Sequence, residues 1–211
     1  MPTDSKLLSI ATARINAANA LDPNTTVVEG APVPHELHYS RRMSRRLEML
    51  DPGASEALRL AVRCQHLQRW MIPRSYYPLT RAGYHRWRTD LSRFHADRAA
   101  DILQGVGYDE ATVARVQSLV RKEGLKTDAE TQTLEDVACL VFLEDEFGDF
   151  ASRHDEEKVI HILVRTWGKM SPRGHAAALA LNLPPDQRAL IEKALARASS
   201  PAAPPAAPAD R

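Results

Sequence analysis

The sequence contains 211 residues, and its 28 Lys and Arg against 27 Asp and Glu give a formal net charge of +1 at pH 7. The length suits one domain with a sizeable core, and a hydrophobic content of 44% excludes a largely disordered chain. No apolar run reaches the ~18 residues of a membrane span, and the N-terminal segment lacks the pattern of a secretory signal, so we expect a soluble cytoplasmic protein.

The hydrophobic pattern predicts helices along almost the whole chain. The first helix spans residues 5–20 and stops before Pro23, because proline lacks the N–H that a helix interior needs. Residues 22–34 are rich in proline and typical of a loop. Within this loop the β-branched run 25–28 has no evident partner strand, so we predict no sheet.

Glycine, proline and aspartate punctuate the rest of the chain, and Asp109 is predicted to cap a helix because its carboxylate can accept from free backbone N–H groups. Breaks are expected at 51–53, 105–107, Gly124 and Gly148. The predicted helices span 35–50, 55–70, 80–104, 109–123, 133–147, 156–168, 172–181 and 185–198. We therefore predict an all-α fold, with a single helical domain over 1–198 and a disordered Pro/Ala-rich tail over 199–211.

Charge is segregated along the chain. Residues 38–93 hold twelve Arg and four acidic residues, whereas residues 128–157 hold eleven acidic residues and one Arg. These blocks either solvate two outer surfaces or include a basic surface that attracts an anionic ligand. The two cysteines, Cys64 and Cys139, lie in apolar stretches, where we expect buried thiols and neither a disulfide nor a thiolate metal site.

Three histidines recur at even intervals: His38, His66 and His95 are separated by 28 and 29 residues, and Asp136 follows 41 residues later. One such residue on each of several helices can converge in a bundle core, where imidazole and carboxylate suit Zn, Fe, Mn or Ni. By helical phase His95 and Asp136 point inward, and Glu123 continues the apolar face of its helix. Each residue also has a purely structural interpretation. His95 could be a hydrogen-bonded core residue, and His66 could pack on Trp70. Asp136 could complete a capping box over 133–136, and Glu123 could be solvated at a helix end.

The order of these elements over residues 35–147 resembles the HD superfamily of helical metal-dependent phosphohydrolases. His38 matches the early histidine of that superfamily, the segment AVRCQHL (61–67) resembles its His-Asp helix, and FHADRAADIL (94–103) resembles its next histidine helix. The segment TLEDVACLVFLEDEF (133–147) resembles the helix with the distal aspartate. No aspartate follows His66, which departs from the pattern.

The resemblance implies a metal site and assigns its residues. His38, His66 and Asp136 would be ligands of a divalent transition metal, and His95 would be a fourth ligand or would bind phosphate. Glu123 would be the catalytic general base. The whole chain also resembles an uncharacterised family of bacterial and fungal proteins, through NAANALDPN (16–24), ELHYSRRMSRRLEML (36–50) and ILVRTWGKMSPRG (162–174).

A basic, aromatic segment, RWMIPRSYYPLTRAGYHRWR (69–88), offers guanidinium groups for phosphate or carboxylate and rings that can stack on bases. Alternatively its rings pack on the core while its arginines lie in water. The predicted anion-binding residues are Arg69, Arg74, Arg81 and Lys169.

Three hypotheses of function follow. The first is a metal-dependent HD-like enzyme that hydrolyses a small phosphorylated or other anionic substrate. The second is a non-enzymatic module that binds a nucleotide or nucleic acid on a degenerate site, although a net charge of +1 is low for a nucleic-acid binder. The third, from the same resemblance, is an iron-dependent oxygenase.

Overall fold

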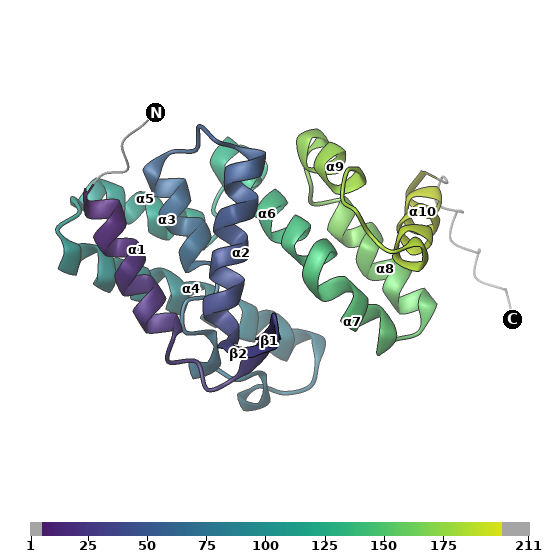
Figure 1. Ribbon diagram of the computed structural model, residues 1–211, viewed down its shortest axis with the longest axis horizontal. Coiled ribbons are helices and arrows are strands. Elements are labelled where there is room, and N and C mark those ends of the chain that lie inside the picture. The colour runs from purple at the N-terminus through teal and green to yellow at the C-terminus, as the bar shows by residue number, and fades with distance from the viewer. Residues whose placement is uncertain (1–5, 200–211) are drawn as a thin grey trace, which may run out of the picture. The chain divides into compact units, whose positions relative to one another are not determined.

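The computed structural model describes residues 6–199 and contains two compact units, one within 1–141 and one within 142–211 (Figure 1). Ten α-helices and one small hairpin in the described residues confirm the all-α prediction. No described helix is both long enough and apolar enough to cross a bilayer. The predicted tail, 199–211, lies outside the described residues apart from Ser199. The single domain and the cytoplasmic location stay predictions.

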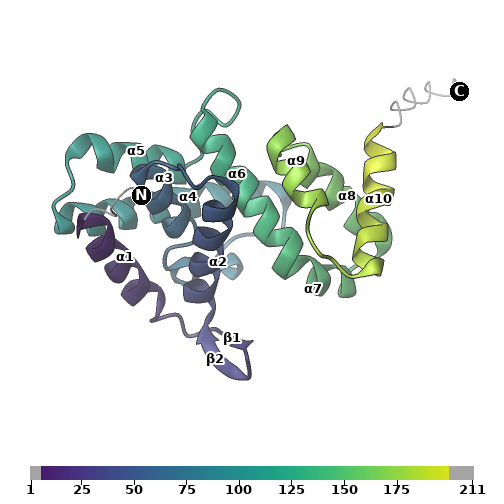
Figure 2. The same cartoon turned by 45° about the horizontal axis from the view of Figure 1, so that its top comes forward.

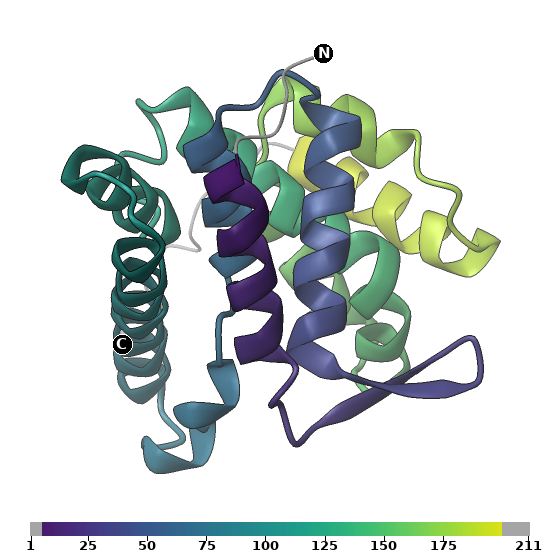
Figure 3. The ribbon, with the colours of Figure 1, turned by 60° about the vertical axis from the view of Figure 1, so that its left-hand side comes forward.

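The first unit is built from helices that pack on α3. Its elements are α1 (Lys6–Asn19), β1 (Thr25–Val28), β2 (Ala31–Pro34), α2 (His35–Leu50), α3 (Glu56–Cys64), α4 (Arg81–Val106), α5 (Glu110–Val120) and α6 (Ala129–Val141). Helix α3 contacts α1, α2 and α5, and α1 lies beside α2 (Figure 3). Leu58, Val62, Met43 and Val116 are fully buried between these helices. Cys64 and Cys139 are buried thiols, as predicted.

Residues 25–34 form a β-hairpin. The prediction that this loop contains no sheet is therefore wrong. Strands β1 and β2 are antiparallel, and Val28 pairs with Ala31. Both residues of the intervening turn, Glu29 and Gly30, have positive φ (50° and 82°), the geometry that matches the twist of a two-residue hairpin. Glutamate lacks the turn preference of Asn or Asp, and prolines in β2 masked the partner strand. The hairpin projects from the start of α2 (Figure 2).

The helix predicted over 55–70 ends at Cys64 instead. A turn follows, and then two short 3₁₀ segments, η1 (Arg69–Met71) and η2 (Arg74–Tyr76). Gln68 adopts a left-handed conformation (φ 54°), and its N–H donates to Asn19 Oδ1 over 3.0 Å. The chain therefore leaves the helical path within the segment that carries His66 and Arg69.

Two helix limits near the predicted site also differ from expectation. Helix α5 begins after its predicted N-cap, Asp109, which accepts from Thr112 N–H over 2.9 Å, but it ends at Val120. Lys122 is left-handed (φ 57°), so Glu123 lies beyond the helix and is exposed, and the prediction that it continues the apolar face is wrong.

Helix α6 begins four residues earlier than predicted. Asp128 accepts from the N–H groups of Glu130 and Thr131, each over 2.9 Å, and so satisfies the free donors of the first turn. A capping box at 133–136 is therefore wrong. The helix break expected at Gly148 does not occur, because a π-helical turn, η3 (Phe142–Glu146), continues directly into α7 (Phe147–Ser152), which contains this glycine.

The second unit contains α7, α8 (Glu156–Trp167), α9 (Pro172–Leu179) and α10 (Pro185–Ser199). The last three helices are close to the predicted ranges, whereas α7 was not predicted. Helix α8 packs against α10, with Leu163, Val159 and Ala194 buried. His175 stacks on Trp167, with ring centroids 3.9 Å apart.

Candidate functional site

A cavity of about 430 Å³ lies in the first unit. Its walls come from the end of α3, from α4, and from the turn after α5. On α4 the lining residues His85, Arg88, Ser92 and His95 are three or four positions apart, so they share one face of the helix. The 26-residue helix thus presents a row of polar side chains from its exposed first turns to its buried centre.

His95 is the buried end of this row, with 2% of its surface exposed. Its Nδ1 lies 2.8 Å from the carbonyl oxygen of Leu67. A carbonyl only accepts, so Nδ1 carries the proton and Nε2 presents a lone pair. Nε2 is buried and has no hydrogen-bond partner among the residues that the structure describes. Burial and the charges of Arg69 and Arg88 lower the pKa of His95 to about 4, so the ring is neutral at pH 7.

His66 lies beside His95, with ring centroids 6.0 Å apart. It stacks on Tyr39 (4.2 Å between centroids). Its Nδ1 is 3.5 Å from Glu36 Oε2, and Arg69 Nη1 lies 2.9 Å from its Nε2. Burial and Arg69 lower the pKa of His66 to about 3, against the opposing effect of Glu36. This imidazole is therefore also neutral, held between a carboxylate and a guanidinium.

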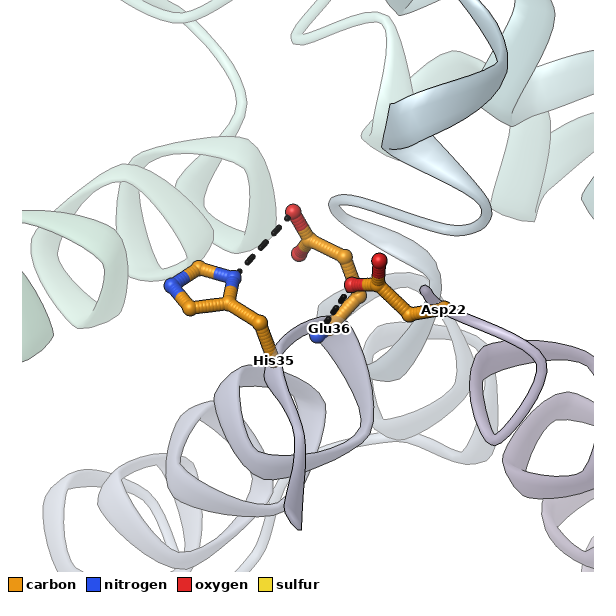
Figure 4. Close-up of side chains that lie close together, drawn as sticks. All are labelled: Asp22, His35 and Glu36. Atoms are coloured by element: carbon orange, nitrogen blue, oxygen red, sulfur yellow. Dashed lines mark hydrogen bonds and ion pairs between the residues drawn. The ribbon is translucent and has the colours of Figure 1, made fainter. Parts of the chain in front are cut away.

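Glu36 also belongs to a group with Asp22 and His35, whose ligand atoms all lie within 4.8 Å of one another (Figure 4). The first turn of α2 explains this arrangement. Pro34 at the N-cap supplies no side-chain acceptor, and Asp22 Oδ2 instead accepts from Glu36 N–H over 2.9 Å. Asp22 Oδ1 accepts from Asn24 N–H over 2.9 Å. One oxygen of Asp22 thus fixes the start of α2 and the other fixes the turn before β1, and we assign the group a capping role.

The cavity is rich in cations. Arg121 pairs with Glu123 over 2.7 Å, and Lys122 pairs with the buried Glu135 of α6. Arg88 and Arg93, both exposed, have neither a hydrogen bond nor an ion pair with any described residue. Two guanidinium groups are therefore available to an anion in the cavity that the buried His95 also lines.

The structure brings four of the predicted site residues together. His66, His95 and Glu123 line the cavity, and Arg69 bonds to His66. Sequence reasoning missed Glu36, Gln65, Arg88 and Arg93. Arg88 lies seven positions before His95 on α4, a spacing that identifies it, whereas Arg93 has no such signal.

The predicted metal ligands are not gathered in one place. His38 is half-buried on α2, where Arg42 and Arg45 contribute positive charge, and Asp136 is buried on α6, where it accepts from Gln132 Nε2 over 3.0 Å. Within residues 6–199, His38, His66, His95 and Asp136 include no three ligand atoms within 4.8 Å of one another. The four residues therefore do not fit one metal ion as they lie.

The other predicted anion-binding residues lie apart from the cavity wall. Arg74 donates to the carbonyls of Tyr77 and Pro78, each over 2.8 Å, and so holds the loop before α4. Arg81 is the exposed first residue of α4, and Lys169 is exposed in the second unit. Their binding of an anion stays a prediction.

Fold and cavity together define a helical protein whose first unit carries a cation-rich cavity with a buried imidazole base. The chain belongs to the family described as a domain of unknown function (DUF4202), whose model matches residues 9–191. This confirms the expected uncharacterised family. Searches of curated proteins and of solved structures gave no match. The resemblance to the HD superfamily stays a hypothesis.

Proposed function

We propose that the chain is an enzyme that hydrolyses a small phosphorylated substrate in the cavity beside α4. The observation that carries the proposal is the buried, unpartnered Nε2 of His95, in a cavity that is also lined by two arginines that pair with no described residue. Arg88 and Arg93 would bind the phosphate, because guanidinium groups match phosphate oxygens with paired hydrogen bonds.

In this mechanism His95 is the general base. Leu67 O holds Nδ1–H, which leaves Nε2 to take a proton from a water whose oxygen attacks phosphorus. The bond between phosphorus and the ester oxygen breaks, and the proton returns to the leaving alcohol. The phosphate brings negative charge beside the imidazole, which raises the pKa of His95 from its low value in the free protein and makes Nε2 a stronger base.

The predicted divalent transition metal remains a separate hypothesis. Because the four predicted ligands do not meet in one group, the proposed proton transfer is assigned to His95 alone. Glu123, the base predicted from sequence, is exposed and paired with Arg121. These contacts suit a residue at the rim of the cavity better than a general base.

The test is phosphate release from a panel of small phosphate monoesters by the full chain. His95→Asn is the matched variant, because an asparagine amide can still donate to Leu67 O but has no counterpart of Nε2. We expect a fall in kcat of about a hundredfold or more. Arg88→Met should raise KM about tenfold or more, whereas Arg86→Met, at an exposed position on the same helix, should change neither.

Two outcomes would contradict the proposal. Full activity in His95→Asn would remove the imidazole from the mechanism. Phosphate esters that bind through Arg88 but are never hydrolysed would favour a non-enzymatic module that binds a nucleotide or nucleic acid.

A further inference from the structure

The cavity contains a second buried acceptor, on Gln65. This residue follows the last residue of α3, and 6% of its surface is exposed. Its Oε1 is buried and has no hydrogen-bond partner within the described part of the chain. Gln65 lines the cavity together with His66 and His95, so it belongs to the same cavity as the proposed base.

An unpaired acceptor in a binding cavity selects the ligand. Buried polar groups in native proteins almost always have partners, because leaving one unpaired destabilises the state that contains it. A water molecule can serve Oε1 in the free protein, but a ligand that displaces this water must replace its hydrogen bond or lose affinity. Sites built to bond a substrate hydroxyl or amine for this reason discriminate strongly against analogues that lack the group.

Different residues of the cavity suit two different chemical groups of such a ligand. Arg88 and Arg93, which offer only donors, suit an anionic group. Gln65 Oε1 and His95 Nε2 offer only acceptors, and His95 is reserved for the reacting water in the proposed mechanism. Gln65 Oε1 is left for the substrate.

We propose that the substrate of this cavity is a small phosphate ester that also carries a hydroxyl or amino group, and that Gln65 Oε1 accepts a hydrogen bond from that group. This inference rests on the proposed function, because it takes Arg88 and Arg93 as the phosphate site. It excludes purely alkyl phosphates as good ligands, and it makes Gln65 a residue that determines specificity.

The experiment is calorimetric titration of the full chain with matched ligands. Inorganic phosphate probes the arginine site alone, propyl phosphate is compared with glycerol 3-phosphate, and ethyl phosphate with phosphoethanolamine. In each pair we expect the ligand with the hydroxyl or amino group to bind about tenfold more tightly or better. Gln65→Met keeps the length of the side chain and removes the oxygen, so it should abolish this preference and leave the affinity for inorganic phosphate unchanged.

The outcomes separate the two proposals. Equal affinities within both pairs, or a preference that survives in Gln65→Met, would overturn the substrate inference while the phosphate site stands. Failure of inorganic phosphate and of every ester to bind would overturn the proposed function and this inference with it. The ligand pairs decide the question in the wild-type chain even when Gln65→Met does not fold.

Discussion

Glu36 Oε2 lies 3.5 Å from His66 Nδ1, so a buried carboxylate at the start of α2 faces a partly buried imidazole that comes after α3. Burial opposes ionisation of Glu36, but its contacts with His35 and His66 and the charge of Arg69 outweigh burial and lower its pKa to about 2. The carboxylate therefore carries the negative charge that balances Arg69 beside the cavity.

Glu36→Gln should destabilise the protein. The substitution keeps the shape of the side chain but leaves the partly buried Arg69 without its counter-charge, and we expect a loss of about 2 kcal/mol in the free energy of unfolding. Chemical denaturation measures this loss. Glu48→Gln, at an exposed position on the same helix, should change stability by less than about 0.5 kcal/mol, and equal effects of the two variants would contradict the role of Glu36.

The buried His95 and the partly buried His66 should make the protein sensitive to acid. The pKa values of His66 and His95 fall from 6.5 to about 3 and about 4 in the folded chain, so below pH 6.5 the unfolded state binds more protons. Stability is therefore full above pH 6.5 and falls as the pH drops from 6.5 toward 4, by at most about 1.4 kcal/mol per pH unit for each histidine.

Unfolding midpoints measured between pH 7 and pH 4.5 test this dependence. His95→Asn should reduce the slope, whereas His161→Asn, at an exposed position on α8, should leave it unchanged. A slope that is identical in the wild type and in His95→Asn would show that His95 does not remain neutral in the folded protein.

Asp22 should stabilise the start of α2 as a cap contributed from outside the helix. Asp22→Ala removes the acceptor for Glu36 N–H, and we expect a loss of about 1 kcal/mol in thermal or chemical unfolding. Asp97→Ala, an exposed change on α4, serves as the control. If Asp22 instead bound a metal, added Zn²⁺ or Mn²⁺ would raise the melting temperature of the wild type and not that of Asp22→Ala.

Gly83 should tolerate no side chain. A Cβ atom there would lie 2.2 Å from the carbonyl oxygen of Pro78, so the loop before α4 must shift in Gly83→Ala, and we expect a loss of about 2 kcal/mol or more. In Gly105→Ala, near the end of the same helix, the new atom would lie 3.1 Å from Arg14 Nη1, the end of a long side chain that donates to Gly105 O and can move away. That variant should be neutral or gain up to about 1 kcal/mol. Similar stabilities for the two variants would contradict the close approach at Pro78.

The metal content of the purified protein distinguishes His95 as a general base from His95 as a metal ligand. We expect no stoichiometric transition metal by plasma mass spectrometry, in wild type or His95→Ala, when the chain is purified without a histidine tag, because the predicted ligands do not converge and Arg69 bonds to His66. One metal per chain that is lost in His95→Ala would make His95 a ligand and restore the metal-dependent mechanism.

Most helices could be predicted because their signals are local. Helix α2 occupies the predicted range 35–50, since Asp51, Pro52 and Gly53 end it within the sequence itself. The end of α3 could not be predicted in this way, because the apolar pattern continues past Cys64 without glycine or proline. There the left-handed Gln68 depends on a hydrogen bond to Asn19, 49 residues earlier.

The histidines of the candidate site could be predicted from the sequence, but the arginines that remain available to a ligand could not. His95 faces inward by helical phase alone, as expected. Which arginines are available depends on tertiary partners: Arg63 bonds to Asn16 and Ser44, and Arg74 to backbone carbonyls, whereas Arg88 pairs with no described residue. A basic block in the sequence therefore locates the charge but does not show which guanidinium groups remain for a ligand.

Through the turn after α3, the position of α1 influences which tautomer His95 adopts. Asn19, the last residue of α1, fixes the left-handed Gln68, and the carbonyl of the preceding residue, Leu67, holds the proton on His95 Nδ1. A shift of α1 along its axis would thus move an oxygen that determines which ring nitrogen is basic. The position of a helix that lines no part of the cavity thereby sets the direction in which His95 can accept a proton.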